Sequence, residues 1–141
     1  MEATEPYFLG LLAEVYGAAG QIELGLEAVS QGLARAEITG EHFWDAELYR
    51  LQGELLLLSG DNRAETSFRQ AINTARSQQA KLLELRATVS LQHLHLAQGK
   101  IVRSDQRLLN IYEWFREGFD TPDLQKGQAL LSNIKLSDVE D

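Results

Sequence analysis

The sequence predicts an all-α fold: three helix–turn–helix pairs forming a right-handed helical-repeat superhelix, closed by a capping helix at the C-terminal end. Three glycines carry this prediction, because Gly20, Gly60 and Gly99 lie 40 and 39 residues apart and each ends a segment with helical apolar periodicity. Only two of the 141 residues are proline, Pro6 and Pro122, so no proline interrupts the segments between them. No alternating, strand-like pattern of useful length occurs anywhere in the chain.

The first repeat is expected at about residues 5–40 and contains two helical segments. Pro6 is typical of the first turn of a helix. The apolar side chains that follow it share one face: Phe8, Leu12, Val15 and Ala19, with Leu9 and Tyr16 beside them. After Gly20, apolar residues recur at the spacing of a second amphipathic helix: Ile22, Leu26, Val29, Leu33 and Ala36. We expect Gly40 to end this helix.

The second repeat, at about residues 42–79, follows the same plan. A helix over about 43–58 ends in a turn that is apolar on all sides, which is typical of a turn packed on both sides. Asp61 or Asn62 can cap the next helix. The apolar face of that helix consists of Ala64, Phe68, Ala71 and Ala75, with Ile72 adjacent.

The third repeat, at about residues 80–118, is less regular. Its first helix, over about 80–98, carries Leu83, Ala87, Leu91 and Leu94, and its second, over about 104–118, carries Leu108, Ile111, Tyr112 and Phe115. The densest aromatic group of the chain lies here: Tyr112, Trp114, Phe115 and Phe119. These rings could form a platform for a ligand, but we expect them to seal the end of the array, since a repeat array must cover its open core.

A capping helix is expected over residues 122–135, with Thr121 as its N-cap and Pro122 in its first turn. Its apolar residues would cover the last pair: Leu124, Leu131 and Ile134. The expected domain therefore covers residues 1–136, and a frayed tail follows at 137–141.

The second helix of each pair repeats a small–large–small pattern. The three copies are Gly25–Val29–Gly32, Ala64–Phe68–Ala71 and, with a large residue in the last place, Ser104–Leu108–Ile111. Small residues allow two antiparallel helices to approach closely, and the large residue fills the space between them. Helix pairs of this kind stack on their neighbours.

Composition excludes several classes of function. The formal net charge of −8 works against binding to nucleic acid, which depends on basic side chains. The chain has no cysteine, so disulfides, thiolate metal sites and a thiol nucleophile are excluded. An acidic N-terminus without a long apolar segment predicts neither a signal peptide nor a membrane span, so we expect a cytoplasmic protein.

No motif predicts catalysis, a cofactor or a metal site. Gly99 and Lys100 lack the other residues of a phosphate-binding loop. His93 and His95 are two residues apart, so they point to opposite sides of a helix, and His42 is far away in the sequence. We therefore expect that the chain is not an enzyme.

The repeats resemble tetratricopeptide repeats. The first repeat matches that motif at Leu9, Leu12, Ala13, Tyr16, Gly20, Gly25, Val29 and Gly32, the second at Tyr49, Gly53, Leu56 and Gly60, and the third at Leu91 and Gly99. The stretch from Leu85 to Leu131 resembles the C-terminal tetratricopeptide region of bacterial multidomain predicted ATPases, many of which carry an adenylate/guanylate cyclase or LuxR-type DNA-binding domain. The resemblance rests on Ser90-Leu91, Gln98-Gly99-Lys100, Tyr112-x-Trp114-Phe115 and Glu117-Gly118-Phe119-Asp120-Thr121-Pro122-Asp123-Leu124.

The resemblance implies that the first helix of each pair lines a concave face. The register of the motif places nine residues there, of which seven are candidate binding residues: Tyr7, Glu14, Glu47, Arg50, Glu54, Arg86 and His93, with Gly10 and Val89 between them. On this basis Arg50 and Arg86 would grip a carboxylate of a partner. The alternative is that Glu14, Glu47 or Glu54 neutralises both arginines within the groove.

Three functions remain open at this stage. The favoured one is a non-catalytic protein-interaction module of a larger signalling ATPase or nucleotide cyclase, whose partner is a protein or peptide, including other domains of the same parent. The second is a superhelix that senses a small effector, and the third is a scaffold for self-association. Neither nucleic acid nor a membrane is an expected partner.

Overall fold

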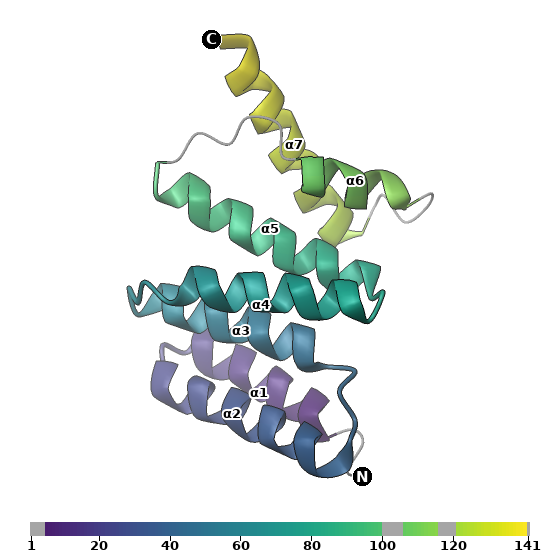
Figure 1. Ribbon diagram of the computed structural model, residues 1–141. Coiled ribbons are helices and arrows are strands. Elements are labelled where there is room, and N and C mark those ends of the chain that lie inside the picture. The colour runs from purple at the N-terminus through teal and green to yellow at the C-terminus, as the bar shows by residue number, and fades with distance from the viewer. Residues whose placement is uncertain (1–4, 100–105, 116–120, 141) are drawn as a thin grey trace.

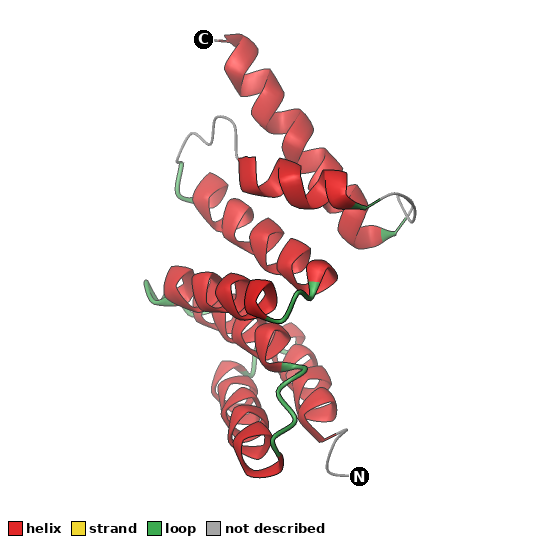
Figure 2. Cartoon of the chain, turned by 45° about the vertical axis from the view of Figure 1, so that its right-hand side comes forward, coloured by secondary structure: helices red, strands yellow, loops and turns green. Residues whose placement is uncertain are grey.

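The protein is all-helical. The computed structural model describes residues 5–99, 106–115 and 121–140, and every regular element among them is a helix (Figure 2). The helices are α1 (Glu5–Ala18), α2 (Ile22–Thr39), α3 (Asp45–Leu58), α4 (Ala64–Ser77), α5 (Lys81–Ala97), α6 (Gln106–Trp114) and α7 (Pro122–Glu140). Within these residues, no helix combines the length and apolar character that crossing a membrane requires.

The helices form hairpins that stack along one direction (Figure 1). Helices α1 and α2 pack against each other, as do α3 and α4, and each following hairpin contacts the one before it through its first helix. Thus α3 contacts both α1 and α2, and α5 contacts both α3 and α4. Helix α7 packs on α5 and α6, at the opposite end of the molecule from α1 (Figure 1). One side of α1, α3 and α5 therefore lies along a common surface.

Glycines end the helices where the sequence predicts. Gly20, Gly40, Gly60 and Gly99 all have φ between 74° and 77°, the left-handed conformation that closes a helix. Glycine adopts it without the steric cost that a Cβ imposes. The turn after α4 has no glycine, and Gln79 takes the same conformation there with φ of 57°.

The small–large–small pattern builds the core of the first two hairpins. Val29 and Phe68, the large residues of the first two triplets, are both fully buried, and the small residues on either side of each are buried as well. The hairpin of α3 and α4 is especially tight, because a Cβ placed on Gly53 would lie 2.5 Å from the Phe68 ring. Asp61 stabilises the turn before α4 by accepting a hydrogen bond from the backbone N–H of Arg63 at 2.8 Å.

The apolar face predicted for α1 is not the buried one. Phe8, Leu12 and Val15 are exposed, and the buried positions of this helix are Pro6, Gly10 and Ala13. The physical reason is that the small residues of α1 let α2 and α3 approach, whereas no described helix lies against the row of larger side chains.

The C-terminal helices also differ from the prediction. Helix α6 ends at Trp114, short of the predicted residue 118, and its predicted start at Ser104 lies outside the described residues. Helix α7 begins at Pro122 as predicted but continues to Glu140, through the tail predicted to fray, since neither glycine nor proline follows Gly127. Among the side chains of α7 that the structure describes, Leu124 and Leu130 are the buried leucines, and Leu131 is partly buried against the same cluster.

The aromatic seal is confirmed only in part. Tyr112 and Phe115 pack against the cluster formed by α5, α6 and α7, whereas Trp114 is exposed and stacks edge-on against Phe115 at 5.2 Å between ring centroids. Phe119 lies outside the described residues, as do the side chain of Ile134 and the structure of Ser104.

Candidate binding groove on helices α1, α3 and α5

A groove runs along the common surface of α1, α3 and α5. It consists of two adjoining cavities of about 630 Å³ and 370 Å³, which share Glu14, Glu47 and Arg86 as lining residues. We call the larger cavity the apolar half and the smaller one the ionic half. The apolar half continues onto the connections before α3 and α5, and the ionic half reaches the first turn of α7.

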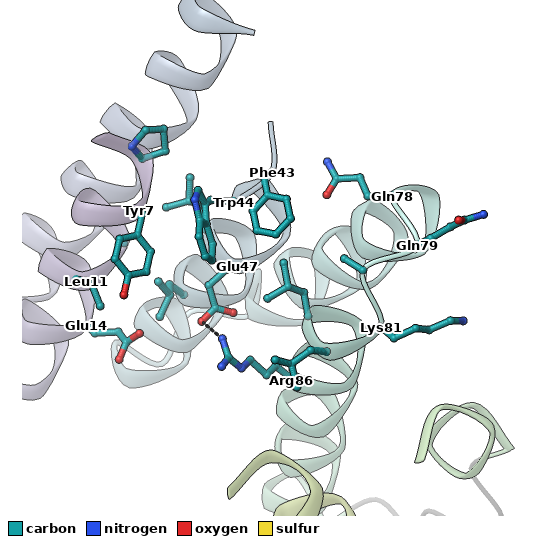
Figure 3. A pocket seen from close by; sticks show the side chains of 17 residues that line it. Tyr7, Leu11, Glu14, Phe43, Trp44, Glu47, Gln78, Gln79, Lys81 and Arg86 are labelled. Atoms are coloured by element: carbon teal, nitrogen blue, oxygen red, sulfur yellow. Dashed lines mark ion pairs between the residues drawn. The ribbon is translucent and has the colours of Figure 1, made fainter. Parts of the chain in front are cut away.

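Aromatic rings form one wall of the apolar half (Figure 3). The ring centroids of Tyr7 and Trp44 are 4.8 Å apart, and Phe43 stands nearly perpendicular to Trp44 at the same distance. Leu11 from α1 and Leu82 from α5 also line this cavity, and both are exposed. Exposed apolar side chains around a hollow are typical of a surface that binds another molecule.

Glu47 organises the ionic half. One of its carboxylate oxygens accepts a hydrogen bond from Arg50 Nε and the other from Arg50 Nη2, both at 2.8 Å. Arg50 also lies 3.6 Å from Glu54, and its Nη1 donates to Ser90 Oγ at 3.4 Å. The two-pronged contact fixes the guanidinium plane as a single ion pair could not.

Arg86 extends this network to the C-terminal helix. Its Nη1 lies 3.6 Å from Glu47, as the dashed line in Figure 3 marks, and its Nε donates to Asp123 at 3.0 Å. Asp123 stands in the first turn of α7, where a negative charge is also favoured by the helix dipole. Side chains of α3, α5 and α7 are thus joined in one chain of ion pairs.

Arg50 stays charged inside this network. Burial disfavours its charged form and is the largest influence on its pKa, but the hydrogen bond and charge of Glu47, helped by Glu54 and Glu14, outweigh it and raise the pKa. The guanidinium is therefore fully protonated and committed to its carboxylates.

The structure brings together the residues that the tetratricopeptide register placed on one face. Tyr7 lines the apolar half, and the other six candidates line the ionic half: Glu14, Glu47, Arg50, Glu54, Arg86 and His93. The expectation that Arg50 and Arg86 offer free positive charge is wrong, because the carboxylates of Glu47, Glu54 and Asp123 pair with them. The alternative, in which Glu47 and Glu54 neutralise the arginines, is observed, and Asp123 is a further partner that the alternative did not include.

Glu14 differs from the other acidic residues of the groove. Its side chain is exposed at the junction of the two halves and acts on Arg50 through its charge alone, because it makes neither a hydrogen bond nor an ion pair with any side chain that the structure describes. The groove therefore holds one carboxylate that is available to a cation.

Sequence reasoning missed Phe43 and Trp44. They precede α3 and were read as the start of that helix, although His42, Phe43 and Trp44 belong to the connection from α2. Two adjacent aromatic residues just before a helix start are the signal that could have identified them, because aromatic side chains outside a periodic apolar face are free to line a surface.

The connection between α2 and α3 also contains a histidine that is hydrogen-bonded to a carboxylate. His42 Nδ1 lies 2.8 Å from Asp45 Oδ2, and this hydrogen bond, together with the negative charge of Asp45, raises the pKa of His42 above its ordinary 6.5. Gln78 from the end of α4 donates to the His42 carbonyl at 3.0 Å. The edge of the apolar half is thus tied to the neighbouring hairpin.

Comparison with known proteins gives one similarity. An uncharacterized protein of Rhizobium meliloti (strain 1021) is 34% identical over 97 residues, which are 67% of this chain. The chain spans 9% of that protein's length, so the matching segment lies within a polypeptide an order of magnitude longer. Neither a protein-family model nor a solved structure matches the chain.

Proposed function

We propose that this chain is a non-catalytic, tetratricopeptide-type interaction module of a larger bacterial signalling ATPase or nucleotide cyclase, and that it binds a peptide segment in the groove. The observation that carries the proposal is the apolar half, a hollow of about 630 Å³ with Tyr7, Phe43 and Trp44 along one wall. Binding sites are concave and largely apolar, with a few polar groups that set orientation.

The groove favours a partner with a bulky apolar side chain next to a lysine or arginine. The apolar side chain would enter the apolar half, and the basic one would reach the carboxylate of Glu14. Because Arg50 and Arg86 are already paired, an acidic partner would find no free cation among them. The net charge of −8 also attracts a basic segment over longer distances.

One observation supports the tetratricopeptide-type architecture, and another supports the placement in a larger protein. The hairpins stack so that their first helices line the groove, as the tetratricopeptide resemblance implies. The similar protein from Rhizobium meliloti is an order of magnitude longer than the matched segment. The partner would be another protein or another domain of the same cytoplasmic parent.

Trp44 provides a direct test. The only other tryptophan is Trp114, which lies on α6 away from the groove, so a Trp114→Phe variant reports on Trp44 alone. Peptides selected from a random library on the immobilised full chain would be titrated into this variant while Trp44 emission is followed. We expect the selected peptides to combine an aromatic or leucine side chain with an adjacent lysine or arginine and to shift the emission to shorter wavelength.

Matched charge substitutions locate the binding site. Leu11→Asp places a carboxylate in the apolar half, and Leu24→Asp does the same on α2, outside the groove, at a residue of similar exposure. We expect Leu11→Asp to weaken peptide binding by at least about tenfold, which is about 1.4 kcal/mol, and Leu24→Asp to leave it unchanged. Equal effects of the two substitutions would overturn the groove as the binding site.

The small-effector alternative remains testable in the same system, because about 630 Å³ also suits a metabolite. In a thermal-shift screen of small metabolites, a molecule that the groove senses would raise the melting temperature of the unmodified chain. A metabolite that shifts Trp44 emission when no selected peptide does so would replace the peptide as the proposed ligand.

A further inference from the structure

A row of large apolar side chains lies exposed on α1. Phe8, Leu12 and Val15 are 54%, 41% and 64% exposed and follow one another along one face of the helix. Phe8 and Leu12 also border a shallow hollow of about 280 Å³. Three such residues in register on one face of a helix are unusual for surface positions.

The next hairpin shows what these positions do elsewhere in the same chain. At the spacing of 40 residues that separates Gly20 from Gly60, Phe8 corresponds to Leu48, Leu12 to Gln52 and Val15 to Leu55. Leu48 and Leu55 are only 1% and 3% exposed, because they insert into the crevice between α1 and α2.

Glycines form that crevice. Gly10 and Gly17 on α1, and Gly25 and Gly32 on α2, are each seven residues apart, as are the two leucines that they receive. A Cβ on Gly25 would lie 2.9 Å from Leu55, and one on Gly32 would lie 3.1 Å from Leu48. The small residues are thus what lets the large ones enter.

The third hairpin repeats the arrangement. At the spacing of 79 residues from Gly20 to Gly99, the row on α1 corresponds to Ala87, Leu91 and Leu94 on α5. All three are buried in one cluster with Phe68 and Ala71 of the preceding α4. In both hairpins the residues that correspond to Phe8 and Val15 pack on the preceding hairpin. At the position of Leu12 this holds for Leu91, whereas Gln52 accepts a hydrogen bond from Ser67 of its own hairpin.

We propose that the row of Phe8, Leu12 and Val15 is a docking surface for one more helix hairpin, supplied by the longer parent protein. Both helices of this hairpin would carry glycine or alanine at seven-residue spacing, as α1 and α2 do where α3 enters between them. The inference rests on the proposed function only in taking the chain as part of a longer protein, and it is independent of groove binding.

A second copy of the chain does not offer what the row requires. The crevice of Gly25 and Gly32 is already filled by Leu55 and Leu48, and the small residues of α4 are already covered by α5. A hairpin from elsewhere in the parent protein therefore fits the row on α1 better than a second copy of this chain does.

A tandem chain tests the inference. Repeating residues 5–44 immediately before Glu5 of the full chain places a copy of α1 and α2 ahead of the original α1, at the spacing that separates α1 from α3. Because the chain has no cysteine, Val15→Cys in the original α1 gives a single thiol whose labelling rate measures its exposure. We expect labelling to be at least about tenfold slower in the tandem chain than in the unmodified one.

Leu58→Cys is the matched control. Leu58 is 64% exposed, like Val15, but lies at the end of α3, so its labelling should be the same in both chains. Equal labelling of Val15→Cys in both chains, with the tandem chain folded by circular dichroism, would overturn the proposal.

The unmodified chain tests the competing occupant. Sedimentation equilibrium is expected to show a monomer whose Val15→Cys labelling does not depend on protein concentration. A dimer that Val15→Glu dissociates would assign the row to a second copy of the chain and overturn the proposal of a separate hairpin. Loss of peptide binding in the groove would not affect either measurement, so the two proposals fail separately.

Discussion

The first two hairpins and the third differ in how closely their helices pack. In the first two, long helices lie side by side along most of their length, and α1 with α2 and α3 with α4 make the most extensive contacts among the described helices. In the third, α5 is paired with the nine-residue α6, and α7 takes part of the surface that a full second helix would cover (Figure 1).

Single residues explain the difference. Ile111 stands where the first two hairpins have Gly32 and Ala71, and a larger side chain at this position holds the two helices apart. On the facing helix, α5 carries buried Gln92 where α3 has Gly53. A repeat that loses its small residues on both helices no longer forms a tight hairpin, and another element must close the core.

The largest effect should come from removing α7. A chain that ends at residue 120 leaves Leu85 and Leu108 without Leu124 and Leu130, which share their cluster. We expect the third hairpin to unfold and the chain to aggregate, because a contiguous apolar patch becomes exposed. Light scattering and thermal denaturation would measure this, and a monomeric truncated chain with an unchanged melting temperature would show that α7 is dispensable.

The tight and open hairpins should respond differently to core truncation. Phe68→Ala is expected to lower the free energy of unfolding by about 3–5 kcal/mol, the usual cost of truncating a buried aromatic side chain. Leu108→Ala, at an equally buried position of the third hairpin, should cost about 2–3 kcal/mol, since a looser site relaxes around the cavity. Chemical denaturation compares the two. A cost below about 1 kcal/mol for Phe68→Ala would refute the assigned packing.

A smaller effect on stability is expected at the two turns that join one hairpin to the next, after α2 and after α4. Gly40 ends α2 and Gln79 follows α4, and both have positive φ. Gln79→Gly is expected to raise the free energy of unfolding by up to about 1 kcal/mol, because it relieves the steric cost of a Cβ in the left-handed conformation. Gly40→Ala should lower it by a similar amount. Changes of opposite sign in the free energy of unfolding, measured by urea denaturation, would confirm that backbone conformation causes both effects. A destabilising Gln79→Gly would contradict this.

The smallest expected effect is the pH dependence of stability that His42 causes in the connection between α2 and α3. The pKa of His42 is raised in the folded protein by Asp45, so this contact contributes stability fully below the unfolded value of about 6.5 and loses it as the pH rises through the folded value. Proton NMR titration of His42 should give a pKa above 6.5, and Asp45→Asn should bring it down. An unchanged titration in Asp45→Asn would show that another group sets the pKa.

Much of the fold could be predicted because helix ends are local. A glycine that must adopt positive φ is visible in the sequence, and Gly20, Gly40, Gly60 and Gly99 all end helices. The buried face of α1 could not be predicted in this way. Periodicity reports where apolar residues recur, but Gly10 is buried because neighbouring helices approach there, and the larger Phe8 is left outside.

The candidate site could likewise be predicted from the sequence only in part. The repeat register placed Arg50 and Arg86 on one surface, since the helices repeat in space as they do in the sequence. The pairing of Arg86 with Asp123 depends on where α7 begins relative to α5, a contact between residues 37 positions apart that no local pattern encodes. Positions on a face were predictable, whereas the state of the charges was not.

The order in which the helices contact one another also has a kinetic consequence. Among the described residues, no helix touches another that is more than two elements away along the chain. Contacts of short sequence separation close small loops, so such a chain folds rapidly and can begin at any hairpin. Because α3, α4 and α5 have neighbours on both sides, their amides should exchange with solvent most slowly, and opening should spread inward from α1 and α7.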